Sequence, residues 1–207
     1  MQLLPQGAVL LPDCRTLIVA DIHLGKSAAF RAQGLPVPEG DSARDFQRLL
    51  DLVKNCDARH LVVAGDFFHA PAGITPELHE SLGRFLDALA LPLTLVAGNH
   101  DAKIRELPGG IESVPYLDLP DVRIVHDPAH VIGDQLHICG HWHPIVKIPD
   151  GKRSSLRLPC FLLRGNTLVL PAYGSFTGGA VLTYGSGDRI FVALRDEVIE
   201  VPEKLFC

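Results

Sequence analysis

Five short clusters of acidic, amide and imidazole side chains occur between residues 21 and 143, and together they could hold metal ions. The clusters are Asp21-Ile-His23, Gly65-Asp66-Phe-Phe-His69, Gly98-Asn99-His100-Asp101, His126 and Gly140-His141-Trp-His143. Taken singly, each has an ordinary explanation, since Gly-Asp and Gly-Asn are common turn sequences. If they meet at one place, their polar groups need partners, and metal ions would supply them.

The donor types favour a pair of divalent ions over a single one. Oxygen and nitrogen donors without thiolate suit Mn²⁺, Fe or Zn²⁺ better than Ca²⁺ or Mg²⁺. Two carboxylates, one amide and four imidazoles are more ligands than one ion takes while it keeps positions open for substrate. Two ions roughly 3.5–4 Å apart that share a carboxylate can use all of them. The clusters therefore predict a two-metal hydrolytic centre, with Mn²⁺ favoured and Fe or Zn²⁺ as alternatives.

The elements before the clusters are short apolar runs that indicate buried strands. Residues 16–20, 61–64 and 93–97 are rich in Leu, Val and Ile and end directly at the polar residues. Amphipathic helical patterns over residues 42–55 and 76–89 separate these runs. Strand–helix–strand alternation predicts a parallel sheet, and ligands bind outside the carboxyl ends of such strands. The clusters are therefore expected to converge at one sheet edge.

The character of the sequence changes after Pro120, where helical periodicity is nearly absent. Strand-like runs cover residues 122–125, 135–139, 156–163, 167–170, 180–184 and 190–194, separated by Gly, Pro and Asp turns. This half is predicted to form a second sheet packed on the first. No linker divides the chain, so residues 1–207 are expected to form a single domain of the α/β class.

The ordered motifs DxH, GDxxH, GNHD, a later histidine and GHxH, between residues 21 and 143, resemble those of the calcineurin-like metallophosphoesterases. The resemblance implies a four-layer α/β/β/α sandwich of two mixed sheets. It assigns one ion to Asp21, His23, Asp66 and His143, and the other to Asp66, Asn99, His126 and His141, with Asp66 bridging. It also implies that His100 lies beside the scissile phosphate and that Asp101 orients it.

Finer resemblances point to nucleases. The second motif ends in His69, where many members of the family have aspartate. This form is similar to the nuclease subunit of the double-strand-break repair complex, which implies a catalytic role for His69. The segment LGKSAAFRAQGLPVPEG (24–40), together with CGHWHP and LPCF…LVLPAYGSFTGG (158–179), resembles the bacterial ligase-associated DNA damage response endonucleases. That group implies a DNA substrate and repair partners such as a ligase or helicase.

We therefore predict a metal-dependent phosphoesterase that acts as a DNA endonuclease in repair. A metal-activated hydroxide would attack phosphorus, and His100 would protonate the leaving oxygen, which typically contributes about 10²–10⁴-fold. Two alternatives stay open. One is a phosphodiesterase or phosphatase for a small phosphoester such as a cyclic nucleotide. The other is a non-catalytic scaffold, against which the intact ligand set argues.

Composition is consistent with a cytoplasmic globular protein. The 207 residues are 47% hydrophobic and carry a formal net charge of −5, which does not favour a generic nucleic-acid binder. Five widely spaced cysteines without a CxxC predict buried free thiols rather than a disulfide framework. The first residues make a poor signal peptide, and no apolar run approaches the roughly 20 residues that span a bilayer.

Several residues near the motifs have two possible roles. His130 and His137 compete with His126 for the fourth motif, although His137 lies inside a strand-like run. Phe67, Phe68 and Trp142 could stack on a base, with packing as the alternative. Two roles are equally possible for a set of basic residues, which either contact phosphates or are ordinary surface charges. These residues are Arg31, Lys103, Arg105, Lys152, Arg153 and Arg157.

Overall fold

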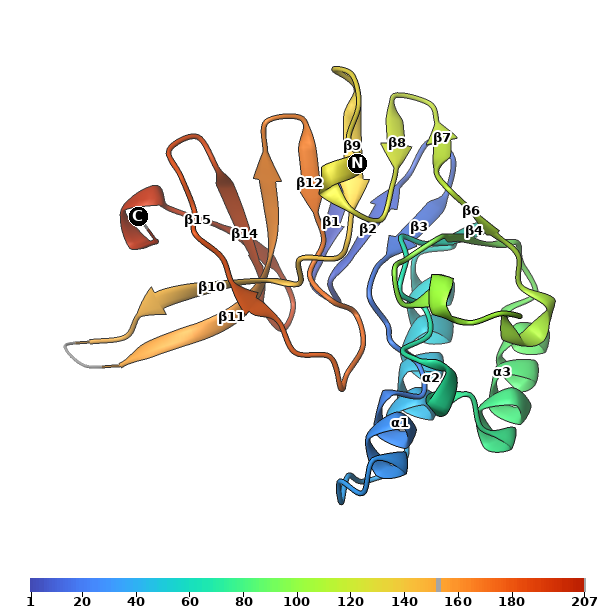
Figure 1. Cartoon of the computed structure of the whole chain (residues 1–207). Coiled ribbons are helices and arrows are strands. Elements are labelled where there is room, and N and C mark those ends of the chain that lie inside the picture. The colour runs from blue at the N-terminus through green and yellow to red at the C-terminus, as the bar shows by residue number, and fades with distance from the viewer. Residues whose placement is uncertain (152–153, 207) are drawn as a thin grey trace.

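The first half of the chain forms a six-stranded mixed sheet (Figure 1). The computed structural model describes residues 1–151 and 154–206. The strands of this sheet follow one another in chain order: β1 Gln2–Leu4, β2 Ala8–Leu11, β3 Thr16–Val19, β4 His60–Val63, β5 Leu93–Val96 and β6 Ser113–Val114. Strands β3 to β6 are parallel, while β1 and β2 pair antiparallel. The predicted strands β3, β4 and β5 are therefore confirmed.

Three α-helices belong to this half: α1 Lys26–Ala32, α2 Asp41–Asn55 and α3 Pro76–Leu89. Both predicted helices, α2 and α3, form close to the expected bounds. The Thr75 side chain caps α3 by accepting a hydrogen bond from the Leu78 N–H, and Pro76 occupies the first turn. The short helix α1 was not predicted, because seven residues give too little periodicity to recognise.

The second half forms a larger mixed sheet of nine strands. Its strands are β7 Leu117–Leu119, β8 Val122–Ile124, β9 Leu136–Cys139, β10 Pro144–Pro149, β11 Ser155–Arg164, β12 Thr167–Val169, β13 Ala180–Val181, β14 Arg189–Ala193 and β15 Val198–Val201. Strands β8, β9 and β12 run parallel and share one direction. Short 3₁₀ helices cover Pro71–Gly73, Asp101–Lys103, Pro108–Gly110, Pro128–His130 and Glu203–Leu205.

Hydrophobic clusters join the layers. One cluster packs the helices on the first sheet, with Phe46 of α2 and Phe85 of α3 stacked at 4.6 Å over strand residues such as Leu61. A second cluster lies between the sheets and includes Ile18 of β3, Ile138 of β9 and Phe161 of β11. Since both faces of the first sheet are buried, its strands read as continuous apolar runs.

The α/β class with two mixed sheets is confirmed. The outer face of the second sheet is covered by strands and connecting segments of the same half. Its outward residues, including Cys139, Cys160 and Leu162, are buried with Trp142 and with other side chains of the same half. No α-helix within residues 1–151 and 154–206 contributes to that cluster. Strand β11 is long enough to pair with β10 at one end and with β12 and β14 at the other. Figure 1 shows the β10–β11 pair at an angle to β12.

Two further expectations can be checked on the fold. Within the part of the chain that the structure describes, no helix has the length and apolar character required to cross a bilayer. Cys14, Cys56, Cys139 and Cys160 are free, as predicted, but Cys14 is exposed rather than buried. Burial raises the pKa of the Cys139 thiol to about 12, so it is protonated at neutral pH. Cys207 lies outside the described residues.

Candidate metal centre

The polar clusters converge where the carboxyl ends of strands from both sheets face each other. The first sheet supplies them after β3, β4 and β5, and the second supplies them after β8 and β9. Backbone hydrogen bonds continue past the strands, from the Asp21 N–H to the Gly65 carbonyl at 3.1 Å and from the His23 N–H to the Asp66 carbonyl at 2.9 Å. Across the second sheet, the Gly140 N–H donates to the His126 carbonyl at 3.0 Å. The ladders therefore hold the clusters in register.

One group of possible ligands consists of Asp21, His23 and His143. One donor atom from each lies within 4.8 Å of the others. Nε2 of His143 is 3.1 Å from Oδ1 of Asp21 and 3.4 Å from Nε2 of His23. Two imidazole nitrogens and a carboxylate aimed at one point are the donor set that a transition-metal ion prefers. These residues come from both sheets, so the site exists only when the sheets pack.

A second group consists of Asp66, His126 and His141, with Asn99 beside it. Its donor atoms again lie within 4.8 Å of one another. Nε2 of His126 is 3.2 Å from Nδ1 of His141 and 3.1 Å from Oδ1 of Asn99. The amide oxygen of Asn99 therefore points at the same place as the imidazoles.

Asp66 lies between the two groups. Its Oδ2 is 3.7 Å from Nε2 of His23 and 3.5 Å from Nε2 of His126. Its other oxygen, Oδ1, accepts a hydrogen bond from the His100 N–H at 2.8 Å. One carboxylate oxygen is thus fixed by backbone while the other is left between the two groups, which is the placement that a bridging ligand requires.

Backbone carbonyls orient the imidazoles. Nδ1 of His126 lies 2.9 Å from the Ala64 carbonyl, and Nδ1 of His143 lies 3.2 Å from the Gly178 carbonyl. Because a carbonyl only accepts, each Nδ1 carries hydrogen and Nε2 is the ring nitrogen that faces the site. Partners of this kind fix the tautomer of metal-binding histidines.

Strained backbone positions the side chains on both sheets. Five of the predicted ligands have left-handed backbone conformations, with φ of 55° at Asp21, 55° at His23, 52° at Asp66, 71° at His141 and 45° at His143. Such conformations are uncommon outside glycine and gather at functional sites. Each turns the chain sharply as it leaves a strand, so that alternate side chains point into the site.

Two glycines allow the close approach of the clusters. A Cβ added at Gly65 would come within 2.1 Å of Nδ1 of His126, and one at Gly98 would come within 2.1 Å of the Asp66 backbone nitrogen. Neither position can carry a side chain without moving its neighbour. The glycines that precede Asp66 and Asn99 are therefore required by packing as well as by turn geometry.

The electrostatics of the buried groups fit a cation. Burial alone would raise the pKa of Asp66, yet its hydrogen bond and charge interaction with His126 lower it to about 2. Burial works against a charged His126, but Asp66 and Asp21 outweigh it and raise the pKa of His126 to about 9. Burial lowers the pKa of His23 to about 3, so that ring is neutral. The carboxylates thus attract positive charge, and oxygen and imidazole donors surround the point where an ion would be.

His100 and His69 form a third cluster beside His23. Nδ1 of His100 lies 2.5 Å from the His69 carbonyl, so this nitrogen carries hydrogen and Nε2 is the free position. The two rings stack at 4.9 Å with 21° between their planes, and Nδ1 of His69 is 3.3 Å from Nδ1 of His23. Burial, followed by the charge of Lys26, lowers the pKa of His69 to about 4.

Asp101 supports the backbone of two motifs. Its carboxylate accepts hydrogen bonds from the N–H groups of Phe67 at 3.3 Å, Phe68 at 2.9 Å and Gly98 at 3.2 Å. The carbonyl that orients the His100 ring belongs to His69 instead. Asp101 thereby ties the turn after β4 to the turn after β5, and it is almost fully buried. Its influence on His100 in this structure runs through the backbone.

Among the alternatives weighed in the sequence, the structure places His126 with the candidate ligands. His130 is exposed in a 3₁₀ helix, and His137 is buried within β9 with Nδ1 bonded to the Gln135 carbonyl at 2.8 Å. Phe67 and Phe68 are fully buried, which favours packing over base stacking among the two roles weighed for them. Trp142 packs into the outer cluster of the second sheet.

The basic residues considered as phosphate contacts differ in whether they already have protein partners. Arg31 is engaged with the Val37 and Pro38 carbonyls and with Glu39. Lys103, Arg105 and Arg157 are exposed. Lys152 and Arg153 lie outside the described residues. The sequence did not single out Lys26, although its charge acts on His23 and His69.

Comparison with known proteins places this geometry among phosphoesterases. The family model described as calcineurin-like phosphoesterase matches residues 14–132. The crystal structure of Pseudomonas putida nuclease MPE is similar, with a TM-score of 0.76 and 31% identity over 92% of this chain and 90% of that one. Yfce, a phosphoesterase from E. coli, is more distant, at a TM-score of 0.45 and 19% identity over 90% of this chain and 97% of that one. No curated protein matches the sequence.

Proposed function

Since the chain belongs to the calcineurin-like phosphoesterase family and is therefore a metal-dependent hydrolase, we propose that it is a DNA endonuclease that works in repair. The observation that carries the proposal is the pair of donor groups that share Asp66, with His100 beside them. The same arrangement supports two ions instead of one. Similarity to a nuclease at 31% identity supports nucleic acid as the substrate class.

The proposed ligand sets follow the geometry. Asp21, His23, Asp66 and His143 would hold one ion, and Asp66, Asn99, His126 and His141 would hold the other. When bound, two divalent ions supply positive charge that acidifies a water molecule and offsets the charge on phosphoryl oxygens. Manganese remains the metal that we favour, with Fe or Zn²⁺ as the alternatives for this mixed donor set.

His100 is the proposed proton donor. With its Nδ1–H bonded to the His69 carbonyl, Nε2 is the position that can give a proton to the leaving oxygen. A water molecule would lose one proton to solvent and add to phosphorus as hydroxide, the bond from phosphorus to the leaving oxygen would break, and that oxygen would take the proton from Nε2. The ring returns to its neutral form with hydrogen on Nδ1.

His69 is proposed to assist by position. Its pKa of about 4, lowered chiefly by burial, keeps the ring neutral at pH 7. The neutral ring stacks on His100 without repelling its charged form, and the His69 backbone carbonyl fixes the orientation of that ring. Asp101 holds the turns that carry both residues. These contacts would keep His100 aimed at the leaving oxygen.

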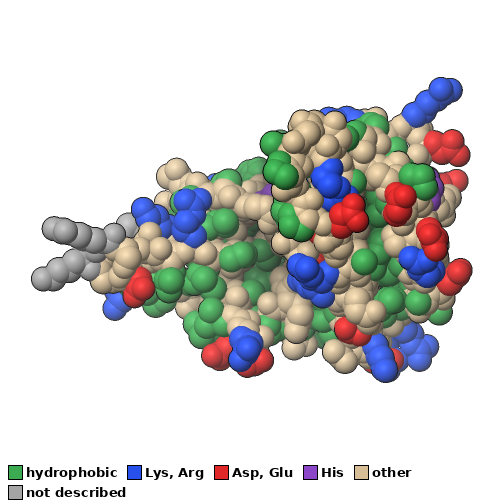
Figure 2. Space-filling model, turned by 90° about the horizontal axis from the view of Figure 1, so that it is seen from below, with side chains coloured by type: hydrophobic (Ala, Val, Ile, Leu, Met, Phe, Trp, Pro, Cys, Tyr) green, Lys and Arg blue, Asp and Glu red, His purple; other side chains and the backbone are tan. Residues whose placement is uncertain are grey.

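A projecting pair of strands supports a polyanionic substrate. The paired residues 144–149 and 155–159 form what we term the β10–β11 arm, on which Lys147 lies directly opposite Arg157 with both exposed. Like charges in this position repel and destabilise a strand pair, whereas a phosphate chain would relieve the repulsion. In Figure 2, blue side chains with a red one among them lie on this arm, while blue and red mix over the helical side.

The test is Mn²⁺-dependent cleavage of end-labelled DNA in single-stranded, gapped and intact duplex forms, with His100→Ala as the control. We expect internal cuts that vanish in the variant. No cuts, together with turnover of bis-p-nitrophenyl phosphate by the same sample, would replace DNA with a small phosphoester as the substrate. Metal content measured on the purified protein tests the scaffold alternative, because a scaffold without chemistry need not retain two ions.

The cellular setting is part of the same proposal. A cytoplasmic location is proposed from the composition, and fractionation of cells would test it. Partners such as a ligase or helicase are proposed from the motif resemblance, and affinity purification after DNA damage would test them. Residues 1–207 are proposed to be one domain, supported by the cluster that joins Ile18 of the first sheet to Ile138 of the second. A single cooperative unfolding transition is expected, and two separate transitions would contradict it.

A further inference from the structure

The helix α1 lies within the segment 24–40, to which the chemistry above assigns no role. It follows β3 and the candidate ligand His23 directly, and Figure 1 shows it at the lower end of the helical layer. Lys26 and Phe30 are four residues apart on this helix, so their side chains share one face. The face therefore combines a cation and an aromatic ring immediately after a ligand.

Phe30 connects this face to the centre. Its ring meets His69 edge-on at 5.9 Å and meets Phe176, from the segment between β12 and β13, at 5.9 Å. Phe30 is partly buried and Phe176 is 37% exposed. Phe67 and Phe68 are fully buried, so they cannot serve a ligand in this way. Two accessible phenyl rings thus lie next to the proposed catalytic pair His69 and His100.

Lys26 belongs to the same place. Its backbone N–H donates to the His23 carbonyl at 3.2 Å. Its side chain is partly buried and lies four residues before Phe30 on α1. Lys26 therefore joins the turn at His23 to the helix face that carries Phe30.

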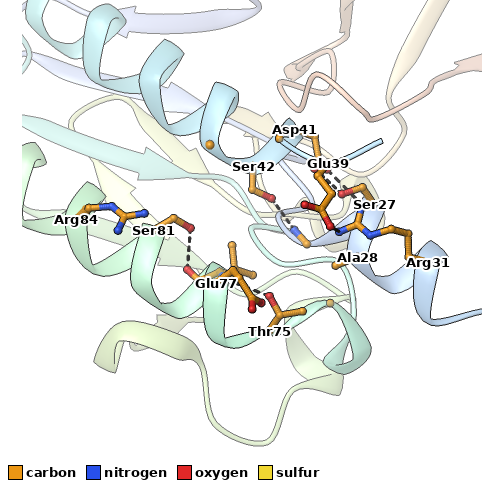
Figure 3. Close-up of a pocket in the computed structure, with 15 residues that line it drawn as sticks. Ser27, Ala28, Arg31, Glu39, Asp41, Ser42, Thr75, Glu77, Ser81 and Arg84 are labelled. Atoms are coloured by element: carbon orange, nitrogen blue, oxygen red, sulfur yellow. Dashed lines mark hydrogen bonds and ion pairs between the residues drawn. The ribbon is translucent and has the colours of Figure 1, made fainter. Parts of the chain in front are cut away.

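Hydrogen bonds anchor the two segments that carry Phe30 and Phe176. The neighbouring stripe of α1 faces a cavity of about 570 Å³, shown in Figure 3, where Ser27 Oγ donates to Asp41 at 2.5 Å. Arg31 also donates to the Val37 carbonyl at 3.3 Å. The Ser175 N–H donates to both carboxylate oxygens of Asp45, at 3.0 and 2.9 Å, which anchors the residue next to Phe176. Rigid support of this kind makes a binding surface less costly to order.

We propose that Phe30 and Phe176 form a stacking subsite for the nucleobase next to the scissile phosphate, with Lys26 contacting a phosphate of the same strand. The inference rests on the proposed nuclease function and names the feature that would distinguish a nucleic-acid strand from a small phosphoester. Base stacking tolerates any sequence, because every base has a π-face. The subsite would therefore position a strand without selecting its sequence.

The first experiment compares an ordinary single-stranded oligonucleotide with strands that carry one abasic nucleotide, placed in turn on either side of the cut. Phe30→Ala and Phe176→Ala should each lower kcat/KM on the ordinary strand by roughly 5- to 150-fold. On the strand that lacks the stacked base, both variants should match the unsubstituted protein. Phe30→Tyr should restore cleavage, and Phe30→Leu should not. Equal losses on both strands, with no rescue by tyrosine, would overturn the subsite.

The matched controls are residues of the same kind elsewhere. Tyr116 is an exposed aromatic ring under Arg123, and Tyr116→Ala should leave both strands unchanged. Lys26→Gln should reduce the dependence of log affinity on log salt by about one unit. Lys54→Gln, at the exposed end of α2, should leave that slope unchanged. A Lys26→Gln slope equal to that of the unsubstituted protein would remove Lys26 from the subsite.

A binding measurement separates this inference from the nuclease proposal. A single strand containing 2-aminopurine is titrated with the metal-loaded His100→Ala protein, in which cleavage is expected to be lost, and stacking is followed as fluorescence quenching. Quenching that Phe176→Ala removes supports the subsite even if the protein cuts no DNA. Cleavage of DNA without any quenching would retain the nuclease and overturn the subsite. Neither cleavage nor quenching would reject both.

Discussion

The two sheets contribute to the candidate centre in different ways. The first sheet supplies Asp21, His23 and Asp66, which are 0%, 4% and 2% exposed. The second supplies His141 and His143, whose side chains are 34% and 20% exposed. The first sheet thus carries both carboxylates on a buried floor and adds the exposed Asn99, whereas the second supplies the buried His126 and two open imidazoles.

The support behind each half also differs. Helices α2 and α3 back the strands of the first sheet through one hydrophobic cluster. The outer face of the second sheet is covered by its own strands and connecting segments. Both halves nevertheless turn their ligands inward with left-handed backbone, at Asp21 and Asp66 on one side and at His141 and His143 on the other. The same left-handed backbone conformation therefore positions ligands on two sheets that are packed differently. Substitutions in the two halves should consequently have unequal effects on metal binding and activity.

Asp66→Asn should have the largest effect, since Asp66 is the one residue proposed to serve both ions. An amide carries no charge and is a weaker ligand, so both ions should be lost and the rate should fall by about 10⁴-fold or more. Metal content by mass spectrometry, alongside cleavage of DNA, measures both effects. Retention of one full equivalent of metal would show that Asp66 does not bridge.

His100→Ala should separate chemistry from metal binding. His100 lies beside the ligands, and its free Nε2 is the proposed proton donor. The variant should keep both ions and lose about 10²–10⁴-fold in kcat. His79→Ala, at an exposed position on α3, is the control and should match the unsubstituted protein. Loss of metal from His100→Ala would make His100 a ligand and move the donor role elsewhere.

Gly65→Ala should weaken one ion site more than the other. The added Cβ would meet the His126 ring at 2.1 Å, and the residue already has a φ of 85°. Displacing His126 should lower affinity for the second ion by roughly 10- to 100-fold, while Asp21, His23 and His143 keep the first. Gly34→Ala shares the backbone strain, with a φ of 84°, but meets nothing within 4 Å. Equal loss of affinity for both ions in a metal titration would show that the two ion sites are not independent.

Asp188→Asn should test the second sheet alone and have the smallest effect. Hydrogen bonds from Arg164, at 2.8 and 2.6 Å, lower the pKa of Asp188 below its usual value. The ionised pair therefore stabilises the folded state above the unfolded-state pKa of about 3.9, and this contribution disappears as pH falls through the lower folded-state pKa. At pH 7 we expect a loss of about 1 kcal/mol in the free energy of unfolding, because Arg164 is partly exposed.

Urea unfolding of Asp188→Asn and the unsubstituted protein at several pH values measures this difference. The two free energies should converge on acidification. Cleavage activity and metal content should be unchanged, because Asp188 touches neither donor group. A difference that grows toward low pH would contradict the role given to the Arg164 pair.

Much of the first sheet could be read from the sequence. Apolar runs such as residues 61–64 and the stripes of α2 and α3 depend on local periodicity, which needs no knowledge of distant residues. The cap at Thr75 was predictable for the same reason. Helix α1 was not, since its seven residues are too few to show a period and its anchors, Asp41 and Ser42, lie beyond it.

The sequence by itself determined the order of the motifs, the donor types and the family to which they belong, because these depend only on which residues follow which strand. Only the tertiary structure decided that His126 rather than His137 meets Asn99, and that Asp101 binds backbone instead of the His100 ring. It also decided that Phe30 and Phe176, far apart in the chain, meet beside His69. The physical reason is that contacts between sheets depend on how two buried faces pack against each other. Local sequence patterns do not specify the distances between residues on different sheets.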